Sequence, residues 1–324
     1  MSSRFCNTML YAAAQVAAGA SALALPLQRA DVPANPAWVL HVDCDSLRPT
    51  AIGQFILSEM DKPGNQAKLA VFQTLFSFDP RKQLHGATLY SVGTAPEDGV
   101  LVVYADFDAD KLTTLAKASE DSQHAAYKQH VIYNWIDEKK KPRKGVKPRT
   151  YAAIAGARVI FGQREARVAQ ALDVLDGASP SLATSKAYPE FGAGGSASFL
   201  EGIARKLDLP ESDPNAALFR LSKQARLQAG ETQHQLTARL VLEANDEQIA
   251  GQMATVGQGL LALLKLQQKK PEAVRFADAI TLKQDGARVI ASLSLPAGDL
   301  IELIKADAAR KAQRKAEKDH AGAK

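Results

Sequence analysis

Short stretches of alternating apolar and polar residues recur along the chain, and this period of two is typical of half-buried β-strands. In the first of them, residues 38–45, the side chains of Leu40, Val42 and Cys44 would point into a core and those between them away from it. The first half of the chain therefore predicts strands at residues 38–45, 85–92, 100–107, 129–136, 151–155 and 158–161.

Segments with helical periodicity lie between these strands. Residues 50–60 and 66–76 read as two helices divided by the breaker Lys62-Pro63-Gly64, and residues 109–118 and 164–175 read as two more. In the second half, residues 198–207 are a short strand or the start of a helix. The further predicted elements are a hairpin of 218–227 and 233–242 around Gly230, a long apolar helix over 246–266 capped by Asn245 or Asp246, a hairpin of 279–283 and 288–295 around Asp285-Gly286, and a final helix from Asp299.

A five-residue motif links the two halves. Gly156-Ala157-Arg158-Val159-Ile160 recurs as residues 286–290, at the same place in the order of elements. This favours an ancient duplication. The expected fold is α+β, with two tandem related units of antiparallel sheet and helices packed on one face. The units would span residues 37–178 and 196–304, joined by a Pro- and Gly-rich linker at 179–195.

The N-terminus has the features of an export signal. Arg4 provides a positive charge, residues 10–18 are apolar, and Ala20-Ser21-Ala22 and Ala22-Leu23-Ala24 are small-x-small cleavage sites. Residues 1–24 are thus expected to be a signal peptide and 25–36 an exposed mature N-terminus. The alternative is an uncleaved amphipathic helix in a cytoplasmic protein. No transmembrane segment is expected after cleavage.

The net charge of +5 conceals an uneven distribution. Residues 139–149 carry +7, the tail 305–324 carries +4, and the chain outside these segments and Arg4 carries −7. A body that is acidic argues against a sequence-specific nucleic-acid surface, which needs basic residues spread over the folded part. The tail is expected to be a solvated helix end.

The segment 139–149 is the strongest compositional anomaly, because three Pro and Gly residues interrupt a run of cations. Such a loop can bind an anionic polymer or an anionic membrane by counterion release, and the alternative is that it only adds solubility. The candidate contacts are Lys139, Lys140, Lys141, Arg143, Lys144, Lys147 and Arg149.

Carboxylates at strand ends are the candidate metal ligands. His41, Asp43 and Asp45 would share one face of a strand, and a second group of aspartates ends another strand. Oxygen ligands of this kind suit Ca²⁺ or Mg²⁺ better than zinc. The alternative is a solvated sheet face on which Asp45 and Asp108 cap the following turns. The weak metal candidates are His41, Asp43, Asp45, Asp106 and Asp108.

No catalytic motif accompanies these residues. The glycine-rich segment 192–196 lacks the Gly-Lys-Ser/Thr ending of a phosphate loop, and neither a Gly-x-Ser-x-Gly elbow nor a His-Glu-x-x-His helix occurs. Cys44 would lie in the core, on the opposite side of its strand from His41. No catalytic residue and no cofactor are therefore predicted.

The stretch Ala30-Asp31-Val32-Pro33-Ala34, followed by Trp38-Val39-Leu40-His41-Val42-Asp43, resembles uncharacterised exported bacterial proteins. In that group a signal peptide precedes a strand-then-helix start and a duplicated α+β body. The resemblance implies export but no activity and no site residues.

One leading hypothesis and two alternatives follow. The first is a non-enzymatic envelope protein of binding or structural type, periplasmic or extracellular, whose partner is an envelope protein or an anionic polymer. The alternatives are a divalent-cation-dependent enzyme that uses the aspartates at strand ends, and a polyanion-binding protein that acts through residues 139–149.

Overall fold

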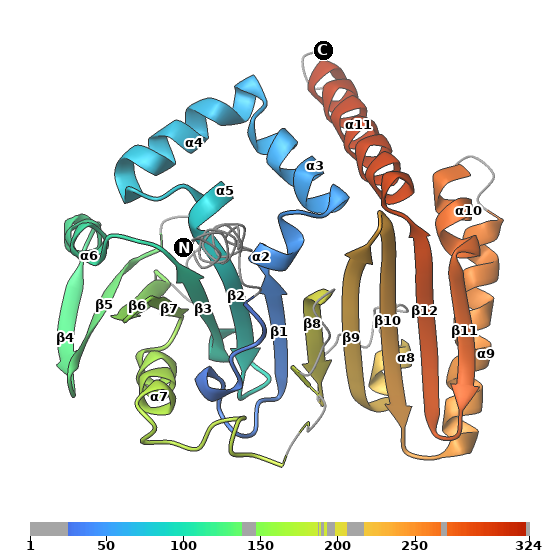
Figure 1. Cartoon of the computed structure of the whole chain (residues 1–324), viewed down its shortest axis with the longest axis horizontal. Coiled ribbons are helices and arrows are strands. Elements are labelled where there is room, and N and C mark those ends of the chain that lie inside the picture. The colour runs from blue at the N-terminus through green and yellow to red at the C-terminus, as the bar shows by residue number, and fades with distance from the viewer. Residues whose placement is uncertain are drawn as a thin grey trace, which may run out of the picture.

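The computed structural model describes residues 25–137, 147–186, 188, 191–192, 198–205, 217–266 and 271–321. In this part of the chain the fold is α+β, with twelve strands in one continuous antiparallel sheet (Figure 1). The strand order is β11-β12-β10-β9-β8-β1-β2-β3-β7-β6-β5-β4.

The first half of the chain contributes one end of the sheet. Its strands are β1 (Trp38–Asp43), β2 (Leu84–Ser91), β3 (Gly99–Ala105), β4 (Gln123–Tyr127), β5 (His130–Ile136), β6 (Arg149–Ala155) and β7 (Arg158–Gly162). Its helices are η1 (Arg29–Asp31), α2 (Cys44–Leu47), α3 (Ala51–Met60), α4 (Pro63–Phe76), α5 (Pro80–Gln83), η2 (Pro96–Asp98), α6 (Ala109–Ala118) and α7 (Glu165–Leu175).

The second half contributes the other end. Its strands are β8 (Ser198–Ala204), β9 (Ser222–Thr232), β10 (Gln235–Ala244), β11 (Ile280–Asp285) and β12 (Arg288–Pro296). Its helices are α8 (Ala217–Arg220), α9 (Glu247–Lys265), α10 (Pro271–Asp278) and α11 (Ala297–Ala321).

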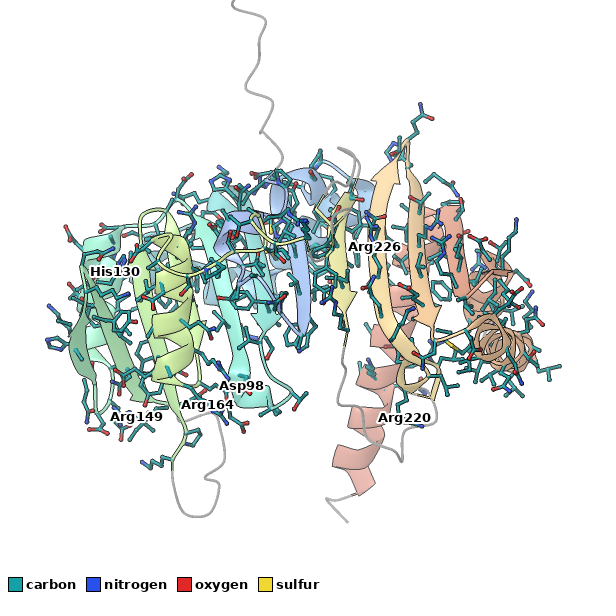
Figure 2. The ribbon with its side chains drawn as sticks, turned by 90° about the horizontal axis from the view of Figure 1, so that it is seen from below. Asp98, His130, Arg149, Arg164, Arg220 and Arg226 are labelled. Carbon is teal, nitrogen blue, oxygen red and sulfur yellow. The ribbon has the colours of Figure 1, made fainter. Side chains whose placement is uncertain are left out.

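The first half packs helices on both faces of the sheet. On one face, which we call face 1, α7, the segment around η1 and the side chains of Leu182, Tyr188 and Phe191 cover a large buried cluster. This cluster includes Val102, Ile160 and Leu172. Buried Asp98 accepts hydrogen bonds from Arg164 and Arg167, at 2.7 and 3.0 Å, and so holds the start of α7 against the sheet (Figure 2). On the opposite face, face 2, lie α6 and α4 (Figure 1).

In the second half the described helices α8, α9 and α10 pack on face 2 only. Met253 and Ala250 of α9 are fully buried against Leu242 and Val289 of the sheet. The final helix α11 leaves the sheet after β12, contacts α10 and α3, and points away from the molecule (Figure 1). The expectation of helices on one face thus describes the second half, and the first half carries them on both.

The halves meet through their first strands. Trp38 of β1 pairs with Ala204 of β8 in an antiparallel ladder. A third apolar cluster spans the junction, since Ile52 of α3 packs with Phe199 and Leu236. The buried carboxylate of Glu231 also accepts the backbone N–H of Ala51 at the start of α3, at 2.7 Å.

Local signals set most helix starts. Thr50, Asp108 and Asp246 each accept the backbone N–H three residues ahead, so each is the N-cap of its helix. Of the two residues considered for capping the long apolar helix, Asp246 is the cap.

The repeated motif occupies equivalent turns in the two halves. Gly156 and Gly286 both have positive φ, at 60° and 55°, and both lead from one hairpin strand to the next. Ala157 and Ala287 each accept a hydrogen bond from the last residue of the neighbouring strand, Ala105 and Ala244, respectively. This correspondence is structural, and the duplication itself stays a prediction.

Three predictions about individual segments were wrong. Residues 25–36 are not an exposed segment, because Leu27, Asp31 and Val32 are buried and Leu27 and Val32 belong to the core of the first half. β1 ends at Asp43 and the chain turns at once into α2, so residues 44–45 are helical rather than extended. The hairpin between β9 and β10 turns at Gln233-His234, both with positive φ, whereas Gly230 lies inside β9. None of the helices in the described ranges is long and apolar enough to cross a membrane.

Candidate functional site

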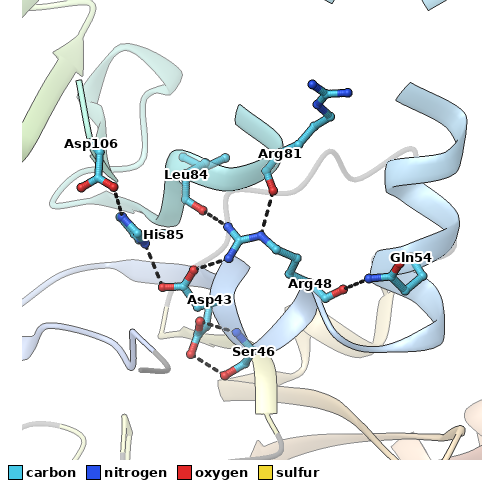
Figure 3. A network of polar contacts seen from close by, with 9 residues as sticks. Asp43, Ser46, Arg48, Gln54, Arg81, Leu84, His85 and Asp106 are labelled. Carbon is cyan, nitrogen blue, oxygen red and sulfur yellow. Dashed lines mark hydrogen bonds and ion pairs between the residues drawn. The ribbon is translucent and has the colours of Figure 1, made fainter. Parts of the chain in front are cut away.

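The carboxylates predicted as metal ligands are held in separate roles. Asp43 is the N-cap of α2 and accepts from the backbone N–H and the hydroxyl of Ser46, at 2.9 and 2.7 Å (Figure 3). Asp108 caps α6 through Lys111 N at 2.9 Å, as the alternative interpretation had it. Asp45 does not cap a turn. It lies in α2 with a nearly buried side chain.

His85 lies between Asp45 and Asp106, in the place where a metal ion was predicted. His85 Nδ1 lies 2.9 Å from Asp45 and its Nε2 lies 3.1 Å from Asp106. Arg48 pairs with the other oxygen of Asp45 at 2.6 Å and also donates to the backbone carbonyls of Arg81 and Leu84 (Figure 3). This cluster ties α2 and α5 to the ends of β2 and β3, and it is a structural network.

His85 and His41 respond to their surroundings in opposite ways. Partial burial alone would lower the pKa of His85, but its hydrogen bonds to Asp45 and Asp106 outweigh this and raise it. Burial lowers the pKa of His41. The His41 ring is satisfied as a neutral group, because Nε2 donates to the carbonyl of Leu25 and Nδ1 accepts from the hydroxyl of Thr88, both at 2.9 Å.

These arrangements give the described residues no metal centre. No group of three or more His, Cys, Asp or Glu side chains suited to a metal ion occurs among them. Cys44 lies in α2 rather than in the core side of a strand, and burial raises the pKa of its thiol to about 11, so it stays protonated at neutral pH.

The basic segment 139–149 can be followed only in part. Lys139, Lys140, Lys141, Arg143 and Lys144 lie outside the described residues. Lys147 lies 4.0 Å from Glu120, and Arg149 pairs with Asp121 at 2.6 Å. Arg149 is thus engaged with the segment after α6, and Lys147 lies at the limit of an ion pair with it.

An apolar concave site lies on face 2 of the first half. It is a cavity of about 510 Å³ between α4, α6 and the strands β3, β7, β6 and β5. This volume is within the range of small-molecule sites, roughly 300–1,000 Å³. The floor is made of outward residues of the sheet, among them Val103, Phe161 and Ile154, and the walls are Phe72 and Phe76 of α4 and Leu112 and Leu115 of α6.

Polar groups are sparse in this cavity. Only Ser119, Tyr133 and Trp135 of the lining side chains carry a polar atom. The hydroxyl of Ser119 donates to the carbonyl of Leu115 at 3.0 Å, so it already has a partner. A site of this composition stabilises an apolar ligand through the area it removes from water.

Helix α4 covers the cavity with few attachments. None of its residues is buried. The rings of Phe72 and Phe76 in α4 lie 4.5 Å apart, and the ring of Phe72 lies 5.9 Å from that of Phe78, which follows the helix. Lys111 of α6 donates to Thr74 O and Ser77 Oγ, at 2.8 and 2.6 Å, and so anchors the C-terminal end of α4.

Sequence reasoning found the elements that surround this cavity but missed the cavity. The local signal was the phenylalanine cluster at positions 72, 76 and 78, which a helix of residues 66–76 could not bury on its own. The partners of these rings come from residues 103–161, so only the tertiary fold reveals the enclosed space.

The comparisons with known proteins reach only distant structures. No family model and no curated protein matches the chain. Two crystal forms of TP0453, a Treponema protein, can be superposed with TM-scores of 0.46 and 0.47 at 11% and 10% sequence identity. The alignments cover 88% and 87% of this chain and 99% and 98% of the other.

Proposed function

We propose that this is an exported, non-enzymatic envelope protein that binds a small ligand with an apolar body beneath α4. The cavity of about 510 Å³ carries the proposal, because its lining is aromatic and aliphatic with few polar atoms. An alkyl or acyl chain, or an apolar ring system, would gain free energy on entry roughly in proportion to the area buried. The sparse polar lining favours recognition by size and shape over recognition by hydrogen bonds.

The attachment of α4 supports entry and release. A helix with no buried residue, fastened by hydrogen bonds near its two ends, can move aside without breaking a packed core. The alternative of a cation-dependent enzyme finds no support in the described aspartates, which serve as caps and ion-pair partners. Polyanion contact through residues 139–149 stays a prediction, and loss of salt-sensitive retention on a polyanion column after deletion of the segment would support it.

The ligand hypothesis is tested by filling the cavity. Ala152 lies on the cavity floor, and Ala152→Phe would place a ring in the empty space. We expect titration with anilinonaphthalene sulfonate, a fluorescent dye with an apolar aromatic body and one sulfonate group, to show saturable binding to the full chain. The filled variant should bind it at least about tenfold more weakly, since a phenyl ring excludes the dye.

The matched control is Ala126→Phe on the edge strand β4, where the side chain is exposed and outside the cavity. It should bind the dye as the unmodified protein does. Equal binding by Ala152→Phe and the unmodified protein would contradict the proposal. Export is tested separately by mass spectrometry of the N-terminus in the native host, where a start near residue 23 or 25 is expected and an intact Met1 in the cytoplasm would contradict it.

A further inference from the structure

A second site lies on face 1 of the second half, where no described helix covers the sheet. Because β-strand side chains alternate, one set from β9, β10, β12 and β11 projects from this face. The pairing places Arg226 beside Val241, Ile290 and Lys283 in one row across the strands. The next row contains Gln228, Arg239, Ser292 and Thr281.

The sheet is hollowed along these rows. One hollow of about 410 Å³ is lined by residues of β9 and β10 and by Arg288, and a second of about 230 Å³ is lined by residues of β10, β11 and β12. Both hollows include Arg239, so they form a continuous surface. Figure 2 shows Arg226 on the second-half strands, away from the part of the sheet that α7 covers.

The two hollows are rich in hydrogen-bond donors and poor in acids. Besides the cations, Gln224, Gln228, Thr281 and Ser292 offer amide or hydroxyl donors. The one acid in the linings, Glu243, pairs with Lys223 at 3.0 Å. Arg288 pairs with Asp285 at the end of its strand, at 3.2 Å.

Arg239 and Lys283, unlike Arg288, have no acidic partner among the described residues. Within the described residues, neither Arg239 nor Lys283 forms an ion pair or a side-chain hydrogen bond, and both are exposed. Arg226 and Arg239 are diagonal neighbours on adjacent strands, a relation that puts side chains about 7–8 Å apart. An anion between the two guanidinium groups would be attracted by both.

We propose that this face binds a ligand that carries two or more oxyanion groups, phosphate or carboxylate. Arginine is suited to both groups, because its planar guanidinium donates two parallel hydrogen bonds to either. Val241 and Ile290 form an apolar floor between the cations, which accommodates the uncharged spacer of such a ligand. The site is independent of the cavity beneath α4 and of residues 139–149.

The test uses two defined ligands, inorganic tripolyphosphate and a trimer of galacturonic acid, in calorimetric titrations of the full chain at low ionic strength. We expect saturable binding of at least one, and which one binds identifies phosphate or carboxylate as the natural group. Arg239→Gln combined with Lys283→Gln should weaken binding at least about tenfold, because charge-assisted hydrogen bonds are the strong ones. Both side chains are exposed, so the variant should fold.

The matched control is Lys82→Gln combined with Lys117→Gln, which removes the same charge from exposed positions of the first half. It should change the affinity less than about twofold. Failure of both ligands to bind would overturn the proposal. Unchanged binding by the Arg239/Lys283 variant would also overturn it, because the anion would then bind at another site, for example on residues 139–149.

Discussion

The two halves of the sheet repeat one arrangement with different results. In the first half Val102 of β3 pairs with Ile160 of β7, and in the second half Val241 of β10 pairs with Ile290 of β12. The repeated five-residue motif ends at Ile160 and at Ile290. Yet Val102 and Ile160 are completely buried beneath α7, whereas Val241 and Ile290 form the floor of open hollows.

The neighbours of these valines explain the difference. On β3, Val102 shares face 1 with Val100 and Tyr104, which are buried as well. On β10, Val241 shares it with Arg239 and Glu243. Charged neighbours make it costly to cover a face, because each charge would lose its hydration. Strand pairing and turns therefore set the topology, and the alternate side chains decide which faces are buried.

The largest expected difference in stability is between truncation of Val102 and truncation of Val241. Val102→Ala should lower the free energy of unfolding by roughly 2 kcal/mol, since two buried methyl groups are lost and a cavity remains. Val241→Ala should lower it by less than about 1 kcal/mol, because this side chain is only partly buried. Urea unfolding of both variants measures the difference. Equal losses would mean that face 1 of the second half is covered in solution.

A smaller effect tests whether the repeated turns are equivalent. Gly156→Ala and Gly286→Ala should each destabilise by about 1–2 kcal/mol, because alanine is strained at positive φ although no atom lies within 4 Å to obstruct its Cβ. Gly259→Ala in α9 is the control. It has equal space but helical backbone, so it should be neutral or stabilising. Thermal unfolding that gives unequal losses for the two turn variants would break the equivalence.

The smallest effects concern pH and the two histidines near the junction. The folded-state pKa of His85 is raised, so its contribution is fully present below the unfolded value near 6.5 and is lost as the pH rises through the folded value. The His85 side chain is about one-third exposed, so we expect less than about 1 kcal/mol.

His41 acts in the opposite direction. Its folded-state pKa is lowered by burial, so its contribution is present above the unfolded value and is lost as the pH falls toward the folded value. The free energy of unfolding, measured by urea between pH 5 and 9 for His41→Gln and His85→Gln, should show the two slopes change in opposite senses. Parallel pH profiles for the two variants would contradict this assignment.

Local sequence signals were sufficient for much of the fold. The helix 109–118 was predicted at its observed bounds, because Asp108 caps it and apolar residues repeat along it. The fold class followed from alternating strands and tight turns. β4 was missed, since four of its five residues are exposed and it shows no alternation of apolar and polar residues.

The candidate sites were less accessible from the sequence. The alternation up to Asp45 suggested a longer strand. However, Asp43 is the N-cap of α2, so the strand ends there and the next residues are helical. The cavity depends on Phe72 meeting Trp135 and Phe161, which are far apart in the chain. The polar face of the second half needs the register of four strands, and that register depends on turns such as Gln233-His234 whose position was misjudged.

The pairing of β1 with β8 has a consequence for how the chain reaches its native state. β1 is among the first strands synthesised, and β8 follows only after the entire first half. Until β8 arrives, one edge of β1 has unpaired backbone groups next to the apolar residues of α3, an edge that can pair with another chain. Closure of the sheet at its centre is therefore a late and slow event, and a chain interrupted before β8 would be prone to aggregate.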